Sequence, residues 1–211
     1  MSSLRRALLR LFFRLLYNEF AWSYDLVAWL ASLGQWKAWG RSSIPHLSGE
    51  RVLDLGHGPG HLLVALSEQG FSPVGLDLSP HMGRQARRRM QRADRCVPLL
   101  QGRAQALPFR AACFDSVVTT FPAEFILDPV TLQEAARVLA PGGRWVAAAS
   151  VRFEGPGLAA CLLRWLYRVT GQHEPVPDAI EAWCRGRGLP ASVTWEQVGR
   201  GAVMLVVAVK P

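Results

Sequence analysis

A cluster of glycines follows an acidic residue in the stretch VLDLGHGPGHLL, which begins at Val52. Asp54 precedes Gly56, Gly58 and Gly60, which alternate with other residues. Glycine lacks the side chain that would block a ligand, and it adopts backbone angles that other residues avoid. The amide groups at the start of a following helix would face such a ligand. The spacing therefore predicts a loop that binds a ligand through its main chain.

The acidic residues around this loop indicate the chemistry of the ligand. The spacing G-H-G-P-G matches neither the dinucleotide fingerprint nor the phosphate loop. Asp54 would repel a pyrophosphate and attract an amino group, whereas Asp77, at the end of the next apolar run, can accept the hydroxyls of a ribose. A cationic amino acid joined to a ribonucleoside describes S-adenosylmethionine, which we expect as the cofactor. The plainer interpretation is a glycine-rich turn with two helix-capping aspartates.

Strand-like and helix-like stretches alternate in the part of the chain that must position these residues. Strands are expected at 51–56, 72–79, 96–102, 114–121 and 144–151, and helices at 60–70, 80–94 and 128–143. This alternation predicts an α/β fold with a parallel sheet and helices on both faces. Two further runs, 192–199 and 202–210, predict an antiparallel hairpin joined by Arg200 and Gly201.

Composition limits the classes that remain. The chain has 211 residues, of which 50% are hydrophobic, and no apolar run reaches the roughly 18 residues of a membrane span. Its four cysteines form no CxxC pair, which argues against a metal site and fits a reducing cytoplasm. The net charge of +8 indicates either an anionic neighbour, such as a membrane surface or nucleic acid, or a solvated basic surface.

Five ordered motifs carry a resemblance to a known family. They are VLDLGHGPG, GLDLSPHM, QGRAQALPF, FDSVVTTFPAEFI and EAARVLAPGGRWV, spread over residues 52–146. The chain resembles the class I S-adenosylmethionine-dependent methyltransferases, strongly over residues 17–150. The resemblance implies a Rossmann-like, seven-stranded, mostly parallel sheet with an antiparallel C-terminal hairpin strand.

The same resemblance implies cofactor contacts by position. Gly56, His57, Gly58 and Gly60 would line the methionine part, Asp54 would orient the loop or meet the amino group, Asp77 would hold the ribose, Leu78 and Met82 would pack near the adenine, and Thr120 and Phe121 would face the sulfonium and the substrate. His57 replaces a common cysteine or serine, and we expect its position to be set by the backbone rather than by chemistry.

Other positions depart from the family or lie closer to the acceptor. Arg103 stands where the family usually has an aspartate that accepts from the adenine amino group, so either Ala104 and its neighbour supply that contact or Arg103 stacks on the ring. Glu124 is the candidate proton acceptor or head-group ligand. Tyr17 and Tyr24 lie in a part that folds over the cofactor in relatives, where Tyr17 would contact cofactor and Tyr24 substrate.

The additions to the common core suggest the acceptor. Residues 1–45 would form a helical cap and 46–211 the methyltransferase domain, with a lid helix inserted at 155–173. Residues 4–16 read as a basic amphipathic helix that can lie in a membrane interface. The stretch FAWSYDLVAWLASLGQWKAWGR is similar to ubiquinone and menaquinone C-methyltransferases, and to bacterial phospholipid N-methyltransferases. We therefore expect a small, lipophilic or amphiphilic acceptor, and a cytoplasmic protein that is peripheral on the inner face of the membrane.

Three alternatives stay open. In the first, the acceptor is a soluble small molecule, and in the second it is RNA. In the third, the chain binds the cofactor without catalysis. The RNA alternative rests on the arginine-rich helix at 80–94, and the absence of a [DN]-P-P-[YF] motif after the fourth strand argues against it. The sequence predicts no oligomeric state.

Overall fold

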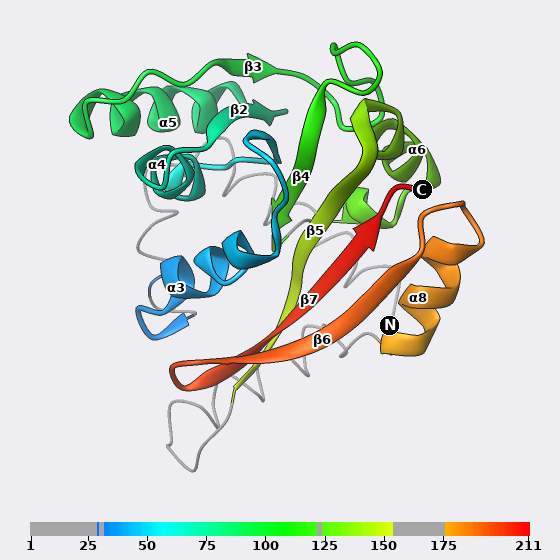
Figure 1. Ribbon diagram of the computed structural model, residues 1–211. Helices are drawn as coiled ribbons and strands as arrows, with labels where there is room; N and C mark the ends of the chain where they lie inside the picture. Colours follow the sequence, from blue (N-terminus) through cyan, green and yellow to red (C-terminus); the bar gives the residue numbers. More distant parts are fainter. Residues whose placement is uncertain (1–28, 30–31, 122–123, 154–175) are drawn as a thin grey trace, which may run out of the picture.

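One seven-stranded sheet forms the centre of the molecule (Figure 1). The computed structural model describes residues 29, 32–121, 124–153 and 176–211. The strands are β1 (Arg51–Leu55), β2 (Ser72–Asp77), β3 (Leu99–Gln101), β4 (Phe114–Thr120), β5 (Leu139–Phe153), β6 (Ala191–Val198) and β7 (Gly201–Val209). Their order is β3-β2-β1-β4-β5-β7-β6, and only the contacts of β7 with β5 and β6 are antiparallel. The predicted fold class is confirmed.

Helices cover both faces of the sheet. They are α3 (Trp36–Arg41), η2 (Ile44–His46), α4 (His61–Glu68), α5 (Pro80–Arg92), η3 (Glu124–Leu127), α6 (Pro129–Val138) and α8 (Pro177–Arg185). Figure 1 shows α3, α4 and α5 on one side, and α6 and α8 on the other. Within the described residues, no helix has the length and apolar composition that crossing a bilayer requires.

Side-chain alternation along the central strands decides which residues reach the site. Val52 of β1 and Val118 of β4 belong to the cluster that packs against Leu62 and other residues of α4. Successive side chains of a strand point to opposite faces. Asp54 therefore shares the α4 face with Val52. Because parallel strands end at the same edge, the sheet presents the last residues of β1, β2 and β4 together beside α4.

Several element boundaries differ from the prediction, among them those of the fifth strand, which comprises 139–153 and not 144–151. The helix expected to run to residue 143 ends at Val138, because Pro141 cannot continue it and Leu139 pairs with Phe114 of β4. The third strand comprises only 99–101 of the expected 96–102. The hairpin turn consists of Gly199, at φ +61°, and the residue after it, one position earlier than predicted.

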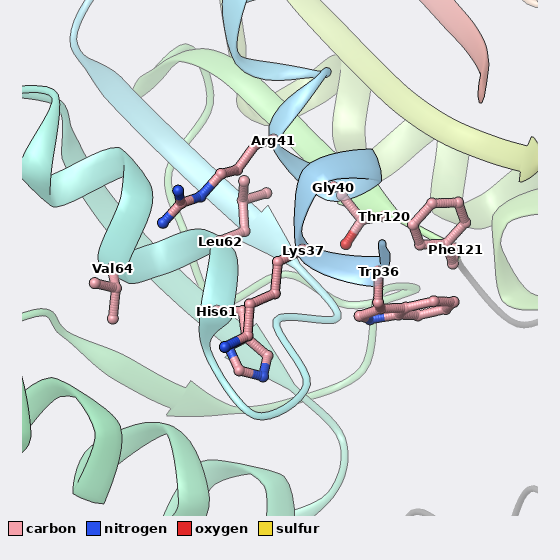
Figure 2. A pocket seen from close by; sticks show the side chains of 9 residues that line it. All are labelled: Trp36, Lys37, Gly40, Arg41, His61, Leu62, Val64, Thr120 and Phe121. Atoms are coloured by element: carbon pink, nitrogen blue, oxygen red, sulfur yellow. The ribbon is translucent and has the colours of Figure 1, made fainter. Parts of the chain in front are cut away.

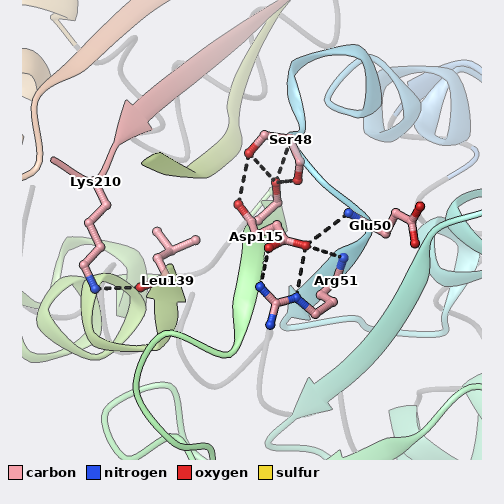
Figure 3. A network of polar contacts seen from close by, with 7 residues as sticks. Ser48, Glu50, Arg51, Asp115, Leu139 and Lys210 are labelled. Atoms are coloured by element: carbon pink, nitrogen blue, oxygen red, sulfur yellow. Dashed lines mark hydrogen bonds and ion pairs between the residues drawn. The ribbon is translucent and has the colours of Figure 1, made fainter. Parts of the chain in front are cut away.

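The end of the sheet opposite the site is held by polar contacts (Figure 3). One carboxylate oxygen of Asp115 accepts from the amides of Glu50 and Arg51, at 3.1 and 2.9 Å, and the other accepts from the Arg51 guanidinium at 2.5 Å. Ser48 donates its hydroxyl to the carbonyl of Asp115 at 3.1 Å. These bonds join the segment that enters β1 to the start of β4.

This contact predicts a pH-dependent stability. The hydrogen bond from Arg51 lowers the pKa of Asp115 to about 2, so its stabilising effect is complete above about pH 4 and is lost as the pH falls toward 2. We expect Asp115→Asn to lower the free energy of unfolding at pH 7 by about 1 kcal/mol, a figure kept small because the pair is partly exposed. Urea unfolding should show the difference shrinking below pH 4, and Asp94→Asn, which removes an exposed carboxylate, should have no such effect. A constant difference down to pH 2 would contradict this reason.

Candidate functional site

The loop between β1 and α4 is fixed at several points. The amide of Gly56 donates to the carbonyl of Leu76 in β2 at 2.7 Å, and the amide of Gly58 donates to Oδ2 of Asp77 at 2.8 Å. From α5, the guanidinium of Arg89 donates to the carbonyl of Pro59. The loop is therefore held to both β2 and α5, with its remaining main-chain groups at the carboxyl edge of the sheet.

The three glycines of this loop serve different purposes, although all have positive φ. A Cβ atom at Gly60 would lie 2.9 Å from that of Ala86, so this glycine lets α5 approach the loop. A Cβ atom at Gly56 would meet the ring of Phe125 at 3.2 Å. At Gly58 it would meet nothing within 4 Å. Packing against α5 therefore requires a glycine at position 60, Gly58 faces open space, and the contacts of these glycines with a ligand stay predictions.

Asp54 is a buried carboxyl group without a partner. Its side chain is completely buried, and neither oxygen has a hydrogen-bond partner among the described residues. Burial, and to a smaller extent the charge of Asp77, raises the pKa of Asp54 to about 8. At neutral pH the carboxyl group of Asp54 is therefore protonated in the free protein. A cation beside Asp54 would favour release of that proton.

Asp77 lies at the end of β2, where the sequence predicted it. Besides Gly58, it accepts from the amide of Ser79 at 2.8 Å, which leaves further lone pairs on both oxygens. The next side chain, Leu78, is 62% exposed. Met82 is fully buried, so it supports the start of α5 and presents no surface to an adenine.

The residues around the predicted adenine position differ in burial. Arg103 is exposed, and the side chain of Ala104 is buried in the core. The amide of Gly102 donates to the carbonyl of Asp77 at 3.0 Å, which brings this segment beside the end of β2. Arg103 thus projects from a segment that adjoins Asp77 and Leu78.

His57 is part of the loop's own structure. It is 6% exposed, and a Cβ atom at Gly75 would lie 2.8 Å from the ring. Nδ1 lies 2.6 Å from the carbonyl of Gly58, and since a carbonyl only accepts, Nδ1 carries the proton. Burial lowers the pKa of His57. The ring packs between the loop and β2, as expected for a position set by the backbone.

A pocket of about 160 Å³ lies next to the end of β4 (Figure 2). It is lined by Trp36, Lys37, Gly40 and Arg41 from α3, by His61, Leu62 and Val64 from α4, and by Thr120 and Phe121. The pocket therefore combines aromatic and aliphatic walls with cationic side chains, at the edge of the sheet that carries the glycine loop.

Phe121 adopts an unusual backbone conformation at this pocket. Its φ is +48°, a value that costs a non-glycine residue roughly 1 kcal/mol or more. The conformation is held by a bond from its amide to the carbonyl of Ala148, at 2.7 Å. Its ring lies 4.4 Å from that of Trp36 and 6.4 Å from that of Trp39. Strain of this kind gathers at functional sites.

Several predicted features lie outside the described residues. They are Tyr17, Tyr24, the helix expected at 4–16 and the lid expected at 155–173. Glu124 begins η3, directly beyond the end of β4, and its side chain is likewise not described. Their roles stay predictions.

Sequence reasoning missed the residues that line the pocket from α3 and the start of α4. Trp36, Lys37 and Arg41 lie in the stretch that resembles quinone methyltransferases, but none of these three residues was assigned to the site. Arg89 was counted with the other arginines of α5, although it holds the glycine loop. One sequence signal could have identified Arg89. It lies one turn beyond Gln85, on the side of the helix that is nearer the buried face.

The described residues fit S-adenosylmethionine. Buried polar groups normally have partners, so the unpaired carboxyl of Asp54 indicates a missing one, and an ammonium group would supply it. Gly58 leaves open space at the loop that follows β1, and Asp77 offers acceptors to a sugar. No metal-binding group of histidine, cysteine or acidic side chains occurs in the described part of the chain.

Comparisons with known proteins show the family of the chain. A family described as a methyltransferase domain matches residues 52–143. A demethylmenaquinone methyltransferase from Mycobacterium sp. (strain KMS) is 33% identical over 93% of both chains, and one from Thermus thermophilus is 31% identical over 93% of this chain and 100% of its own. The solved structure of a SAM-dependent methyltransferase from Thermotoga maritima superposes with a TM-score of 0.67 at 19% identity, over 94% and 99% of the two chains, which shows the shared fold.

The fold, the ligand-facing loop and relatives that match along almost the whole chain point to one conclusion. The chain belongs to the class I S-adenosylmethionine-dependent methyltransferases: it is a methyltransferase similar to the demethylmenaquinone enzymes, and S-adenosylmethionine is its cofactor.

Proposed function

We propose that the chain methylates a ring carbon of a reduced, quinone-type lipid at a membrane surface. The observation that carries the proposal is the pocket between α3 and α4, whose aromatic and aliphatic walls stand beside the glycine loop. The demethylmenaquinone methyltransferases that match this chain support the choice of acceptor.

The cofactor residues have distinct roles in this proposal. Asp54 loses its proton and pairs with the ammonium group, Gly58 permits close approach to the main chain, and Asp77 accepts from the ribose hydroxyls while it holds the loop. Leu78 packs on the adenine, and Arg103 stacks on it from the adjoining segment. When bound, S-adenosylmethionine supplies an electrophilic methyl group on a sulfonium, so the protein's task is mainly to align the acceptor and exclude water.

The acceptor lies between α3 and the end of β4. Trp36, Phe121 and Leu62 form the walls for a planar ring, and Thr120 faces the methyl group. Lys37 stabilises the phenolate formed when a ring hydroxyl loses its proton, and the charge of this phenolate moves to the neighbouring carbon as that carbon attacks the methyl group. The ring carbon gains the methyl group and gives up its proton. Glu124 is the proposed acceptor of a proton, and Tyr24 a proposed substrate contact.

Labelled methyl transfer tests the proposal. The full chain and methyl-labelled S-adenosylmethionine are incubated with a prenylated 1,4-naphthohydroquinone kept reduced by dithiothreitol, with the oxidised quinone, with phosphatidylethanolamine vesicles, and with an RNA pool. We expect label on a ring carbon of the hydroquinone and none on the quinone, whose ring is electron-poor. Label confined to phosphatidylethanolamine or RNA would overturn the proposed acceptor, and so would the absence of label from all four.

A further inference from the structure

The cationic side chains of the helices are concentrated on one face of the sheet. Helices α3, α4 and α5 together carry seven lysines and arginines and one glutamate. Helices α6 and α8, on the other face, carry two arginines and three acidic residues. The excess of positive charge on the described helices therefore belongs largely to α3, α4 and α5, and α3 and α4 also line the pocket.

Helix α5 contributes most of this charge. Its buried side is formed by Met82, Ala86 and Met90. Its exposed side chains include Arg84, Arg87, Arg88 and Arg92. None of these four arginines forms an ion pair with a carboxylate in the described part of the chain, and Arg84 bonds to Nδ1 of His81 at 2.8 Å. A solvated helix of this length usually carries acidic side chains four residues from its basic ones, and α5 has none.

We propose that the exposed side of α5, with Lys37 and Arg41 of α3, docks on an anionic lipid bilayer. Helix α4 contacts both α3 and α5, so the three helices form one surface, and the pocket lies between α3 and α4 within it. A bilayer met by this surface brings a lipid acceptor to the pocket. The inference rests on the proposed function, because a lipid acceptor is the reason for the protein to bind a bilayer. The docking itself is measured without any acceptor.

The chemistry of the surface favours lipid head groups over RNA. Proteins that bind single-stranded nucleic acid interleave their cations with aromatic side chains on which bases stack. Helix α5 contains no aromatic residue apart from His81, which Arg84 contacts. Arginine guanidinium groups bind the phosphates of head groups without further chemistry. The attraction weakens with salt, because exposed charges are screened beyond about 10 Å at 0.1 M.

Vesicle sedimentation tests the docking. The full chain is compared with the variant R84Q/R87Q/R88Q/R92Q on vesicles of 30% phosphatidylglycerol in phosphatidylcholine, at low salt. We expect the variant to partition roughly 100-fold more weakly, since each cation near an anionic leaflet contributes separately. The full chain should bind pure phosphatidylcholine vesicles equally weakly. The matched control R110Q/R185Q/R187Q/R200Q removes four exposed arginines outside this layer, and it should bind as the full chain does.

Each outcome of this experiment decides the inference. Equal losses in both quadruple variants would show a mere effect of net charge and overturn it, as would unchanged binding of the α5 variant. A variant that keeps its vesicle binding but loses binding to an RNA pool would identify RNA as the partner instead. Methylation of a detergent-dispersed hydroquinone should be the same in all three proteins. If none of the three proteins methylates the hydroquinone, the proposed function is contradicted. The vesicle result tests the docking independently of that outcome.

Discussion

Replacing Gly58 by leucine is expected to weaken the binding of S-adenosylhomocysteine by roughly 100-fold, because a side chain here enters the open space at the loop where we propose that the ligand binds. The structure offers no clash within the free protein, since a Cβ atom at this position meets nothing within 4 Å. Leucine disfavours the φ of +52° that this position has, so the substitution should lower the free energy of unfolding by only about 1–2 kcal/mol. Calorimetric titration of the purified variant measures the affinity.

Gly70 provides a matched control for this substitution. It follows α4 at φ +87°, and a Cβ atom there also meets nothing within 4 Å. Gly70→Leu therefore introduces the same strain away from the loop, and it should leave the affinity unchanged while lowering the melting temperature as much as Gly58→Leu does. If the two variants lost affinity equally, or if Gly58→Leu bound normally, the open space at Gly58 would not be where the ligand lies.

Asp54→Asn is expected to stabilise the free protein and to weaken cofactor binding. Between about pH 4 and pH 8 the folded protein keeps a proton on Asp54 that the unfolded chain releases, because burial raises the pKa of this carboxyl to about 8. The wild-type protein therefore loses stability as the pH rises through this window. Asparagine does not ionise, so the free energy of unfolding of the variant, relative to wild type, should increase by several kcal/mol from about pH 4 to pH 8, and the cost of its own buried amide adds a constant offset. Urea unfolding at several pH values measures this increase, and a difference that does not vary with pH would contradict it.

Cofactor binding by the Asp54→Asn variant tests the function of Asp54 separately from its effect on stability. An ammonium group beside Asp54 favours the carboxylate, so wild-type protein should release close to one proton on binding S-adenosylhomocysteine at pH 7. Calorimetry in buffers of different ionisation enthalpy counts that proton, and Asp54→Asn should release none and bind at least roughly 30-fold more weakly. Asp178→Asn, in the exposed first turn of α8, is the control. Proton release by the Asn variant equal to that of wild type would place the ammonium group elsewhere.

Asp54 thus lowers the stability of the free methyltransferase while it serves the proposed function. A carboxyl buried without a partner destabilises the free fold, and the same group is what we propose to recognise the charged end of the cofactor. A cofactor whose ammonium group pairs with the carboxylate of Asp54 stabilises the bound protein. We therefore expect the melting temperature to rise more on ligand binding in wild type than in the Asn variant.

Local sequence determined the order of elements and the cofactor loop. Apolar runs of strand length between helical stretches predicted the parallel sheet, because hydrophobic periodicity and turn residues act over a few neighbours. The glycine spacing after Asp54, and the carboxylate at the end of the next strand, predicted the ligand for the same reason. The boundary at Val138 was missed, since the pairing of Leu139 with Phe114 joins residues far apart in the chain.

Tertiary structure alone decided what each of these residues does. Segments brought together from distant parts of the sequence decide that Gly60 makes room for α5 and that Gly58 faces open space. They also decide that Asp54 has no hydrogen-bond partner among the described residues. The pocket is another example, because α3, α4 and the end of β4 each contribute a wall. A sequence pattern specifies which face of an element is buried, but packing between elements decides which space is left over for a ligand.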